Sequence, residues 1–223
     1  EVFSRLDALG LAPDFRGSAL DFGCGVGRLT QALARRFADA CGVDISQAMV
    51  EQARALDRGQ GACRFLVNGT EDLAVVPDRT FSFVYSSIVL QHLPPRLASS
   101  YLGEFLRVLT PGGLLVFQVP DRHKVRSLAQ ALAFCRLRLA LGTRVRRRLA
   151  RLGGGPRPFT MELHCLPEPA VREVVTRGGG RVVDVAFTNS NRSDFNGDLC
   201  YLPGEPAEGI VSKQYCVLKE GAP

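Results

Sequence analysis

The stretch ALDFGCGVGRLTQAL, residues 19–33, joins a short apolar run to an amphipathic segment through closely spaced glycines. Glycine has no Cβ, so a turn rich in glycine adopts positive φ and lets a ligand approach the backbone. The segment from Arg28 to Phe37 predicts a helix because its apolar residues recur on one side. Strand, glycine turn and helix together predict the nucleotide-binding corner of an open α/β sheet.

The glycines follow a G-x-G-x-G spacing, whereas dinucleotide sites that cradle a pyrophosphate favour G-x-G-x-x-G. Asp21 ends the apolar run, where its carboxylate favours a cationic group over a phosphate. The stretch resembles motif I of class I S-adenosylmethionine-dependent methyltransferases; the alternative is a glycine turn in another α/β protein. The resemblance implies S-adenosylmethionine as the cofactor, held by Asp21, Gly23, Cys24, Gly25 and Gly27.

Length and composition predict one globular domain over residues 1–223, since 223 residues with 46% hydrophobic content bury one core well. No apolar run approaches the roughly twenty residues that span a bilayer, and the first ten residues do not form a secretory signal. The seven cysteines are scattered without a C-x-x-C pair, so neither a disulfide framework nor a metal site is expected. These features predict a cytoplasmic protein with reduced thiols.

A second strand is predicted at Ala40–Asp44, with Asp44 about twenty residues beyond the glycine turn. An acidic residue there accepts hydrogen bonds from both ribose hydroxyls of a bound nucleotide. In the family that the chain resembles, the acid at this strand end holds the ribose. Ile45 and Met49 follow, and two interpretations stay open for them: an adenine sandwich or ordinary packing.

After a third predicted strand at Cys63–Val67, the segment Asn68-Gly-Thr-Glu-Asp-Leu73 resembles the part of the family that passes the adenine edge. Many members carry Asp where this chain has Gly69. The usual contact with the adenine amino group must then come from the Thr70 backbone or from Glu71. Glu71 is equally well interpreted as a solvated loop charge.

The fourth predicted strand, Thr80–Ser87, resembles motif IV, and Ser86 and Ser87 are expected where its carboxyl end meets the ligand. His92 follows one helical turn later, and its candidate roles are general base, positioning group or structural histidine. His164 precedes a helix predicted at Pro167–Arg177. It is expected either to contact or deprotonate the acceptor or to be a solvated edge residue.

A turn at Thr110–Gly113 and the apolar run Leu114–Phe117 resemble the family's fifth strand, and continuous apolarity is typical of a buried parallel strand. Alternating residues at Arg181–Thr188 and Ile210–Lys219 predict a final antiparallel pair. The expected fold is therefore a Rossmann-like α/β sheet of seven strands with helices on both faces, parallel except for its last strand.

The segment 122–158 interrupts this pattern as a predicted helical insertion, and residues 122–161 contain eleven Arg or Lys and no Asp or Glu. Leu and Phe recur at helical spacing, so one face is apolar and the rest cationic. Three interpretations remain: a lid over the acceptor, peripheral contact with an anionic membrane, or binding of RNA phosphates. Nucleic acid is the least favoured partner, because no aromatic residues are interleaved.

The combined motifs imply a methyltransferase that transfers the methyl group of S-adenosylmethionine to a small molecule. The cationic amphipathic insertion suggests a hydrophobic or lipid-linked acceptor. Methyl transfer requires alignment more than covalent help, so the sequence leaves O-, N- and C-acceptors open. The alternatives are a catalytically silent binding module and an RNA methyltransferase; a nicotinamide-dependent oxidoreductase is disfavoured by the glycine spacing.

Overall fold

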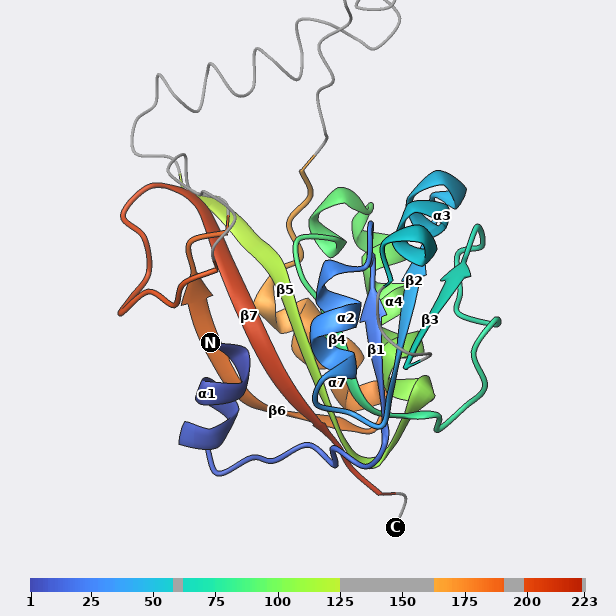
Figure 1. Ribbon diagram of the computed structural model, residues 1–223. Coiled ribbons are helices and arrows are strands. Elements are labelled where there is room, and N and C mark those ends of the chain that lie inside the picture. Colours follow the sequence, from blue (N-terminus) through green and yellow to red (C-terminus); the bar gives the residue numbers. More distant parts are fainter. Residues whose placement is uncertain (58–61, 125–162, 191–198, 222–223) are drawn as a thin grey trace, which may run out of the picture.

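The computed structural model describes residues 1–57, 62–124, 163–190 and 199–221, and its centre is a twisted β-sheet (Figure 1). Within these residues seven strands pair in the order β3-β2-β1-β4-β5-β7-β6. The strands are β1 (Ser18–Phe22), β2 (Asp39–Asp44), β3 (Cys63–Val67), β4 (Phe81–Ser86), β5 (Leu109–Lys124), β6 (Gly180–Thr188) and β7 (Gly209–Lys219).

Strand directions confirm the predicted sheet. The pairs β1–β2, β1–β4, β2–β3 and β4–β5 are parallel. The last strand, β7, is antiparallel to both β5 and β6, between which it lies. The order of pairing reverses between β1 and β4, where successive crossovers leave in opposite directions. This switch point is where open α/β sheets bind their ligands.

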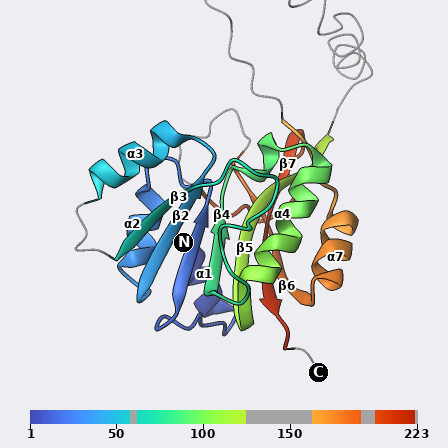
Figure 2. The same ribbon diagram turned by 90° about the vertical axis from the view of Figure 1, so that its right-hand side faces the viewer.

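Helices cover both faces of the sheet, with α4 and α7 on one side and α1, α2 and α3 on the other (Figure 2). The helices are α1 (Val2–Ala8), α2 (Arg28–Ala34), α3 (Gln47–Leu56), the 3₁₀ turn η1 (Leu90–His92), α4 (Pro95–Val108) and α7 (Glu168–Arg177). Because both faces are covered, all six residues of β4 are buried, which explains its nearly continuous apolar sequence.

Two large apolar clusters hold the layers together. Leu102, Phe105 and Val175 pack from α4 and α7 onto one face, where the rings of Phe117 and Tyr215 stack at 5.0 Å. The other cluster joins α1 and α2 to the sheet and contains Leu6, Leu33, Phe37, Phe83 and Val116. Helix α1 is thus part of the core, and its Arg5 also forms an ion pair with Asp184 of β6 at 2.6 Å.

The strand β5 is longer than predicted. Leu109 pairs with Phe81 and Leu114 with Phe83, so the Pro-Gly-Gly sequence between Leu109 and Leu114 bulges out as the expected turn. At its other end β5 continues to Lys124 through antiparallel pairing with β7. The predicted boundary of the insertion at residue 122 is therefore wrong, because residues 122–124 extend the sheet. Residues 125–158 of that insertion lie outside the described residues.

Within the described part of the chain, no helix combines the length and the apolar character required to cross a bilayer.

Candidate cofactor cleft

A cleft of about 350 Å³ opens at the carboxyl ends of β1, β2 and β3, beside the switch point. One wall comes from these strand ends and the loop after β3, and the other from the beginning of α4. The lining residues are Phe22, Gly23, Val43, Asp44, Ile45, Asn68, Gly69, Thr70, Glu71, Val89, Leu93, Leu97 and Tyr101. Six of them, Gly23, Asp44, Ile45, Gly69, Thr70 and Glu71, are among the predicted cofactor-binding residues.

The glycine turn has the backbone that its sequence predicts. Gly23, Gly25 and Gly27 have φ of +76°, +52° and +78°, in the left-handed region that favours glycine. A Cβ on Gly23 would lie 2.3 Å from Cγ2 of Val89, whereas a Cβ on Gly25 would meet no atom within 4 Å. Gly23 is therefore required for close packing beneath the cleft, and Gly25 leaves open space for a ligand.

Asp44 joins the turn to the next helix. Its Oδ2 accepts a hydrogen bond from the Gly25 backbone N–H at 2.8 Å, and its Oδ1 accepts one from the Ser46 N–H at 2.9 Å. Ser46 in turn caps α3 by accepting from the Met49 N–H at 3.4 Å. Each carboxylate oxygen keeps a further lone pair. Asp44 is thus fixed at the cleft with acceptor capacity remaining for hydroxyl groups.

Asp21 lies beneath the turn and is only 2% exposed, so it does not line the cleft. Its Oδ2 accepts a hydrogen bond from Oγ1 of Thr30, in the first turn of α2, at 2.7 Å. Burial raises the pKa of Asp21 to about 6, against the opposing effect of the Thr30 hydrogen bonds. Its carboxylate thus touches the motif I helix rather than the open space of the cleft.

Two other predicted contacts lie off the lining. The Cys24 side chain packs with Val50 and Phe65, and burial raises the pKa of its thiol to about 12. Met49 is 40% exposed on α3, whereas Ile45 is 76% exposed on the cleft rim. Of the two candidates for an adenine sandwich, the structure places only Ile45 at the cleft.

The two predicted partners for an adenine amino group in the loop after β3 differ in the acceptor capacity that they keep. The Thr70 carbonyl accepts hydrogen bonds from the Tyr101 hydroxyl at 2.6 Å and from Nδ2 of Asn68 at 3.4 Å, which occupy both of its lone pairs. Glu71 forms an exposed ion pair with Arg96 at 2.7 Å. Of the two predicted partners for an adenine amino group, Glu71 therefore keeps the greater acceptor capacity.

The two candidate catalytic histidines belong to neighbouring segments. The backbone N–H of His164 donates to the carbonyl of Gln91 at 2.8 Å, directly beside His92. Nδ1 of His92 is buried and has no hydrogen-bond partner among the described residues, while its Nε2 lies 3.2 Å from Nε2 of Gln91. Neither histidine lines the cleft.

The carboxyl end of β4 is more buried than expected. Ser86 is fully buried, and its Oγ has no hydrogen-bond partner among the described residues; Ser87 is partly buried, and neither lines the cleft. The next residue, Ile88, has a φ of +62°, which is strained for a β-branched side chain. Its N–H donates to Oε1 of the buried Gln118 at 3.0 Å, and Nε2 of Gln118 donates to Ser212 at 2.7 Å. This strained turn, absent from the sequence prediction, places Val89 against the glycine turn.

Several lining residues are also absent from the prediction. Leu93, Leu97 and Tyr101 follow an i, i+4, i+8 spacing that marks one face of a helix. The spacing in the sequence therefore indicates that these three residues share one helix face, but it does not indicate that this face lines the cleft. Among the described residues, no three His, Cys, Asp or Glu side chains are grouped to hold a metal ion.

The sheet order and the cleft beside the switch point define a Rossmann-like α/β domain, a class that binds ligands at this point of the sheet. A family model described as a methyltransferase domain matches residues 20–117, which include the glycine turn, Asp44 and the whole loop after β3. These residues are therefore similar to a methyltransferase domain, as the sequence motifs indicated. The match ends within β5, so it covers the cleft but not β6 and β7.

Curated relatives match about half of the chain. Trans-aconitate 2-methyltransferase of Methylobacterium radiotolerans is 40% identical over 107 residues, which are 46% of this chain and 38% of the relative. Ubiquinone biosynthesis O-methyltransferase of Paracidovorax citrulli is 32% identical over 116 residues, 51% of this chain and 48% of the relative. The matched segment spans less than half the length of either relative.

Solved structures match nearly the whole chain. A methyltransferase of Methanosarcina mazei has a TM-score of 0.64 at 18% identity and covers 94% of this chain and 95% of its own. Magnesium protoporphyrin IX methyltransferase of Synechocystis, solved with bound S-adenosylhomocysteine, has a TM-score of 0.59 at 20% identity over 98% and 80% of the two chains. At these identities the agreement establishes the fold.

Proposed function

We propose that the chain is an S-adenosylmethionine-dependent methyltransferase acting on a small molecule. The observation that carries the proposal is the cleft at the switch point, where Asp44 is fixed beside a glycine turn that leaves open space at Gly25. Named methyltransferases are 32–40% identical to about half of this chain, and solved structures of the same fold hold the cofactor or its demethylated product.

In this proposal Asp44 accepts hydrogen bonds from the ribose hydroxyls, and the adenine lies between Ile45 and the loop at Gly69–Glu71. The glycine turn approaches the methionine part, with Asp21 acting from beneath. S-adenosylmethionine supplies an activated methyl group: the acceptor atom bonds to the methyl carbon while the carbon–sulfur bond breaks and its electron pair stays on sulfur. The chain's task is to align the acceptor and exclude water.

The histidines His92 and His164 are our candidates for handling the acceptor's proton. His92 follows β4 in the 3₁₀ turn, and the backbone beside it is bonded to His164. A base is needed only if the acceptor must lose a proton before it attacks. We propose that one of the two accepts that proton, and that Ser86 and Ser87 contribute to the cofactor site from the carboxyl end of β4.

We further propose a hydrophobic or lipid-linked acceptor and a single domain over residues 1–223, with the basic segment as its lid or membrane contact. The support is the cationic amphipathic sequence after β5. The names of related enzymes include ubiquinone and a phytyl hydroquinone, but also trans-aconitate. A small carboxylate is therefore the competing acceptor.

Calorimetric titration with S-adenosylmethionine, S-adenosylhomocysteine and NAD tests the cofactor. We expect micromolar binding of the first two and none of NAD. Asp44→Asn should weaken binding at least tenfold, whereas Glu51→Ala on the exposed face of α3 should not change it. Thermal unfolding of both variants controls for folding. Absence of binding to a folded wild-type sample would refute the proposal.

Two further assays separate the remaining possibilities. Transfer of labelled methyl groups to quinols or to tricarboxylates distinguishes the two acceptor classes, and binding without any transfer would favour a silent binding module. Co-sedimentation with anionic vesicles, compared with a variant lacking residues 128–152, tests the membrane contact. If both proteins stay in the supernatant, the lipid-linked acceptor loses its support.

A further inference from the structure

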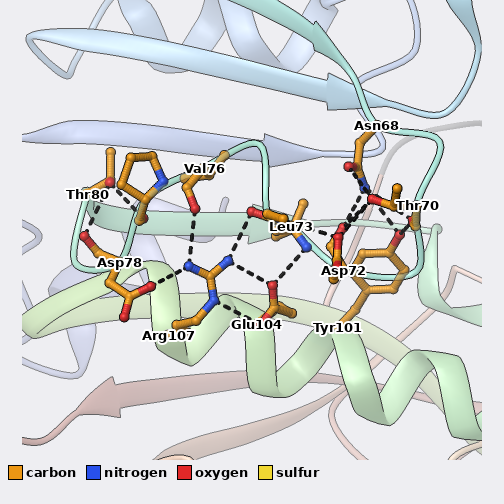
Figure 3. Close-up of polar contacts among 12 residues, drawn as sticks. Asn68, Thr70, Asp72, Leu73, Val76, Asp78, Thr80, Tyr101, Glu104 and Arg107 are labelled. Carbon is orange, nitrogen blue, oxygen red and sulfur yellow. Dashed lines mark hydrogen bonds and ion pairs between the residues drawn. The ribbon is translucent and has the colours of Figure 1, made fainter.

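Two charged side chains of α4, Glu104 and Arg107, form hydrogen bonds with the backbone of the long loop between β3 and β4 (Figure 3). Nη2 of Arg107 donates to the Leu73 carbonyl at 2.9 Å, and Nη1 donates to the Val76 carbonyl at 3.1 Å. Glu104 completes the contact, because its Oε2 accepts from the Leu73 N–H at 2.8 Å. Both the donor and the acceptor of the Leu73 backbone are thus held by α4.

The guanidinium of Arg107 is fully engaged. Its remaining donors reach Glu104 at 2.9 and 2.7 Å and Asp78 at 2.5 Å, so all five N–H groups have acceptors. The hydrogen bonds from Arg107 lower the pKa of Glu104, so the carboxylate stays charged at neutral pH. Charge-assisted bonds of this kind are stronger than neutral ones, and only a planar fork makes five of them.

Tyr101 continues the same face of α4 toward the cleft. Its hydroxyl donates to the Thr70 carbonyl at 2.6 Å and lies 3.3 Å from Nδ2 of Asn68. Asn68 itself donates to the Asp72 carbonyl at 2.7 Å and accepts from the Thr70 hydroxyl at 3.0 Å. We call Tyr101, Glu104 and Arg107, spaced three residues apart, the α4 clamp.

The clamp holds a segment that has no regular structure of its own. Residues 68–80 form neither helix nor strand. Backbone hydrogen bonds hold the two ends of the segment, and between them the buried side chains of Leu73 and Val76 anchor it beside the clamp. A loop of this length without such ties samples many conformations. The end of the segment that lines the cleft, residues 68–71, is continuous with the part that Arg107 and Glu104 hold.

We infer that Glu104 and Arg107 are positioning residues that set the affinity for the adenosine end of the cofactor by pre-ordering residues 68–73. Neither lines the cleft, so each acts only through the loop. With the loop ordered in the free protein, binding does not have to supply that ordering. The inference rests on the proposed cofactor, and it adds residues that no family motif marks.

The test uses substitutions that keep size and much of the polarity. Arg107→Lys keeps the charge but replaces the fork by one ammonium, and Glu104→Gln keeps an acceptor for the Leu73 N–H but loses the charge. We expect each to raise the Kd for S-adenosylhomocysteine and the KM for S-adenosylmethionine about 2- to 30-fold, with kcat nearly unchanged. Amide hydrogen exchange at residues 68–76 should quicken in the free variants and slow again once the ligand is bound.

Two controls separate positioning from general loss of stability. Arg177→Lys changes an arginine of α7 whose partner Glu173 is exposed, and its ligand affinity should equal that of the wild type. Val175→Ala opens a cavity in the apolar cluster that also contains Leu73 and Val76 of the loop. It should therefore lower the melting temperature and leave the Kd for the ligand unchanged.

The outcomes distinguish the two claims. If the folded wild type binds neither ligand, the proposed function fails and this inference fails with it. If the wild type binds and the clamp variants bind equally well, the inference alone is overturned. It is also overturned if Val175→Ala weakens binding as much as the clamp variants do at equal loss of stability.

Discussion

Asp21 provides a quantitative test of how the turn is built, because its carboxyl is buried and its pKa is raised. The pKa of about 6 in the folded protein, against the ordinary value of 3.8 for an aspartate side chain, corresponds to about 3 kcal/mol. Between these values the folded state binds the proton more tightly than the unfolded chain. The contribution of Asp21 to the free energy of unfolding therefore falls as the pH rises from about 4 to about 7, and then levels off.

Replacing Asp21 by Asn removes this titration while keeping the shape of the side chain. Relative to the wild type, the Asp21→Asn variant should gain about 3 kcal/mol of stability as the pH rises from about 4 to about 7. If the amide changes the strength of the hydrogen bond to Thr30, the free energy of unfolding of the variant changes by the same amount at every pH, so its dependence on pH is unaffected. Urea unfolding at a series of pH values measures the difference, and far-ultraviolet circular dichroism is the suitable signal because the chain has no Trp.

A second substitution checks the cause of the raised pKa. Thr30→Val removes a hydrogen bond that lowers the pKa of Asp21. The pKa of Asp21 in the folded protein, and with it the upper end of the pH range over which stability falls, should therefore move above about 6. If the free energies of unfolding of the wild type and of Asp21→Asn differ by the same amount at every pH, the assignment of a buried, titrating carboxyl is refuted. A difference that grows in the opposite direction would mean that the ionised form is the one the fold stabilises.

Three further predictions concern the turns at the cleft. Gly25→Ala should leave the fold intact, should lower the free energy of unfolding by about 1 kcal/mol because of the positive φ, and should abolish measurable cofactor binding in calorimetry. Gly23→Ala should lower the melting temperature more than Gly25→Ala does, because its Cβ meets Val89. Ile88→Gly should relieve the backbone strain at φ +62°, which offsets part of the free energy lost with the side-chain packing. A fall in the free energy of unfolding as large as that for a fully buried Ile would contradict the assignment of strain to this residue. Gln118→Leu should destabilise by about 1–3 kcal/mol in urea unfolding, because the Ile88 N–H loses its acceptor.

The sequence was sufficient for the features that depend on short-range patterns. The strand at Cys63–Val67 has the predicted bounds, and the glycine turn and the acid at the end of β2 lie where their spacing places them. Each of these signals is contained in a few neighbouring residues. The number of strands and the reversed direction of the last one followed from the family resemblance that these motifs carry, whereas the order of the strands was not predicted.

Features set by distant partners were not predictable in this way. Strand β5 extends to Lys124 because β7, encoded some ninety residues later, supplies its hydrogen bonds. The burial of Asp21 and Ser86 depends on the helices that close over them, and the clamp contacts of Arg107 span about thirty residues of sequence. A sequence pattern shows that a helix has an apolar face, but only packing decides which polar residues beside that face reach across to another loop.

The position of β7 between β5 and β6 has a consequence for how the chain is made. During synthesis β6 emerges before β7, yet in the described fold it pairs only with β7, so it has no strand to join until residue 219 is available. Until then the edge of β5 and the apolar side of α7 are exposed to water, and such surfaces favour association with other chains. Strand β7 therefore closes the open sheet edge by inserting into the gap between β5 and β6 rather than by adding to the outside of the sheet.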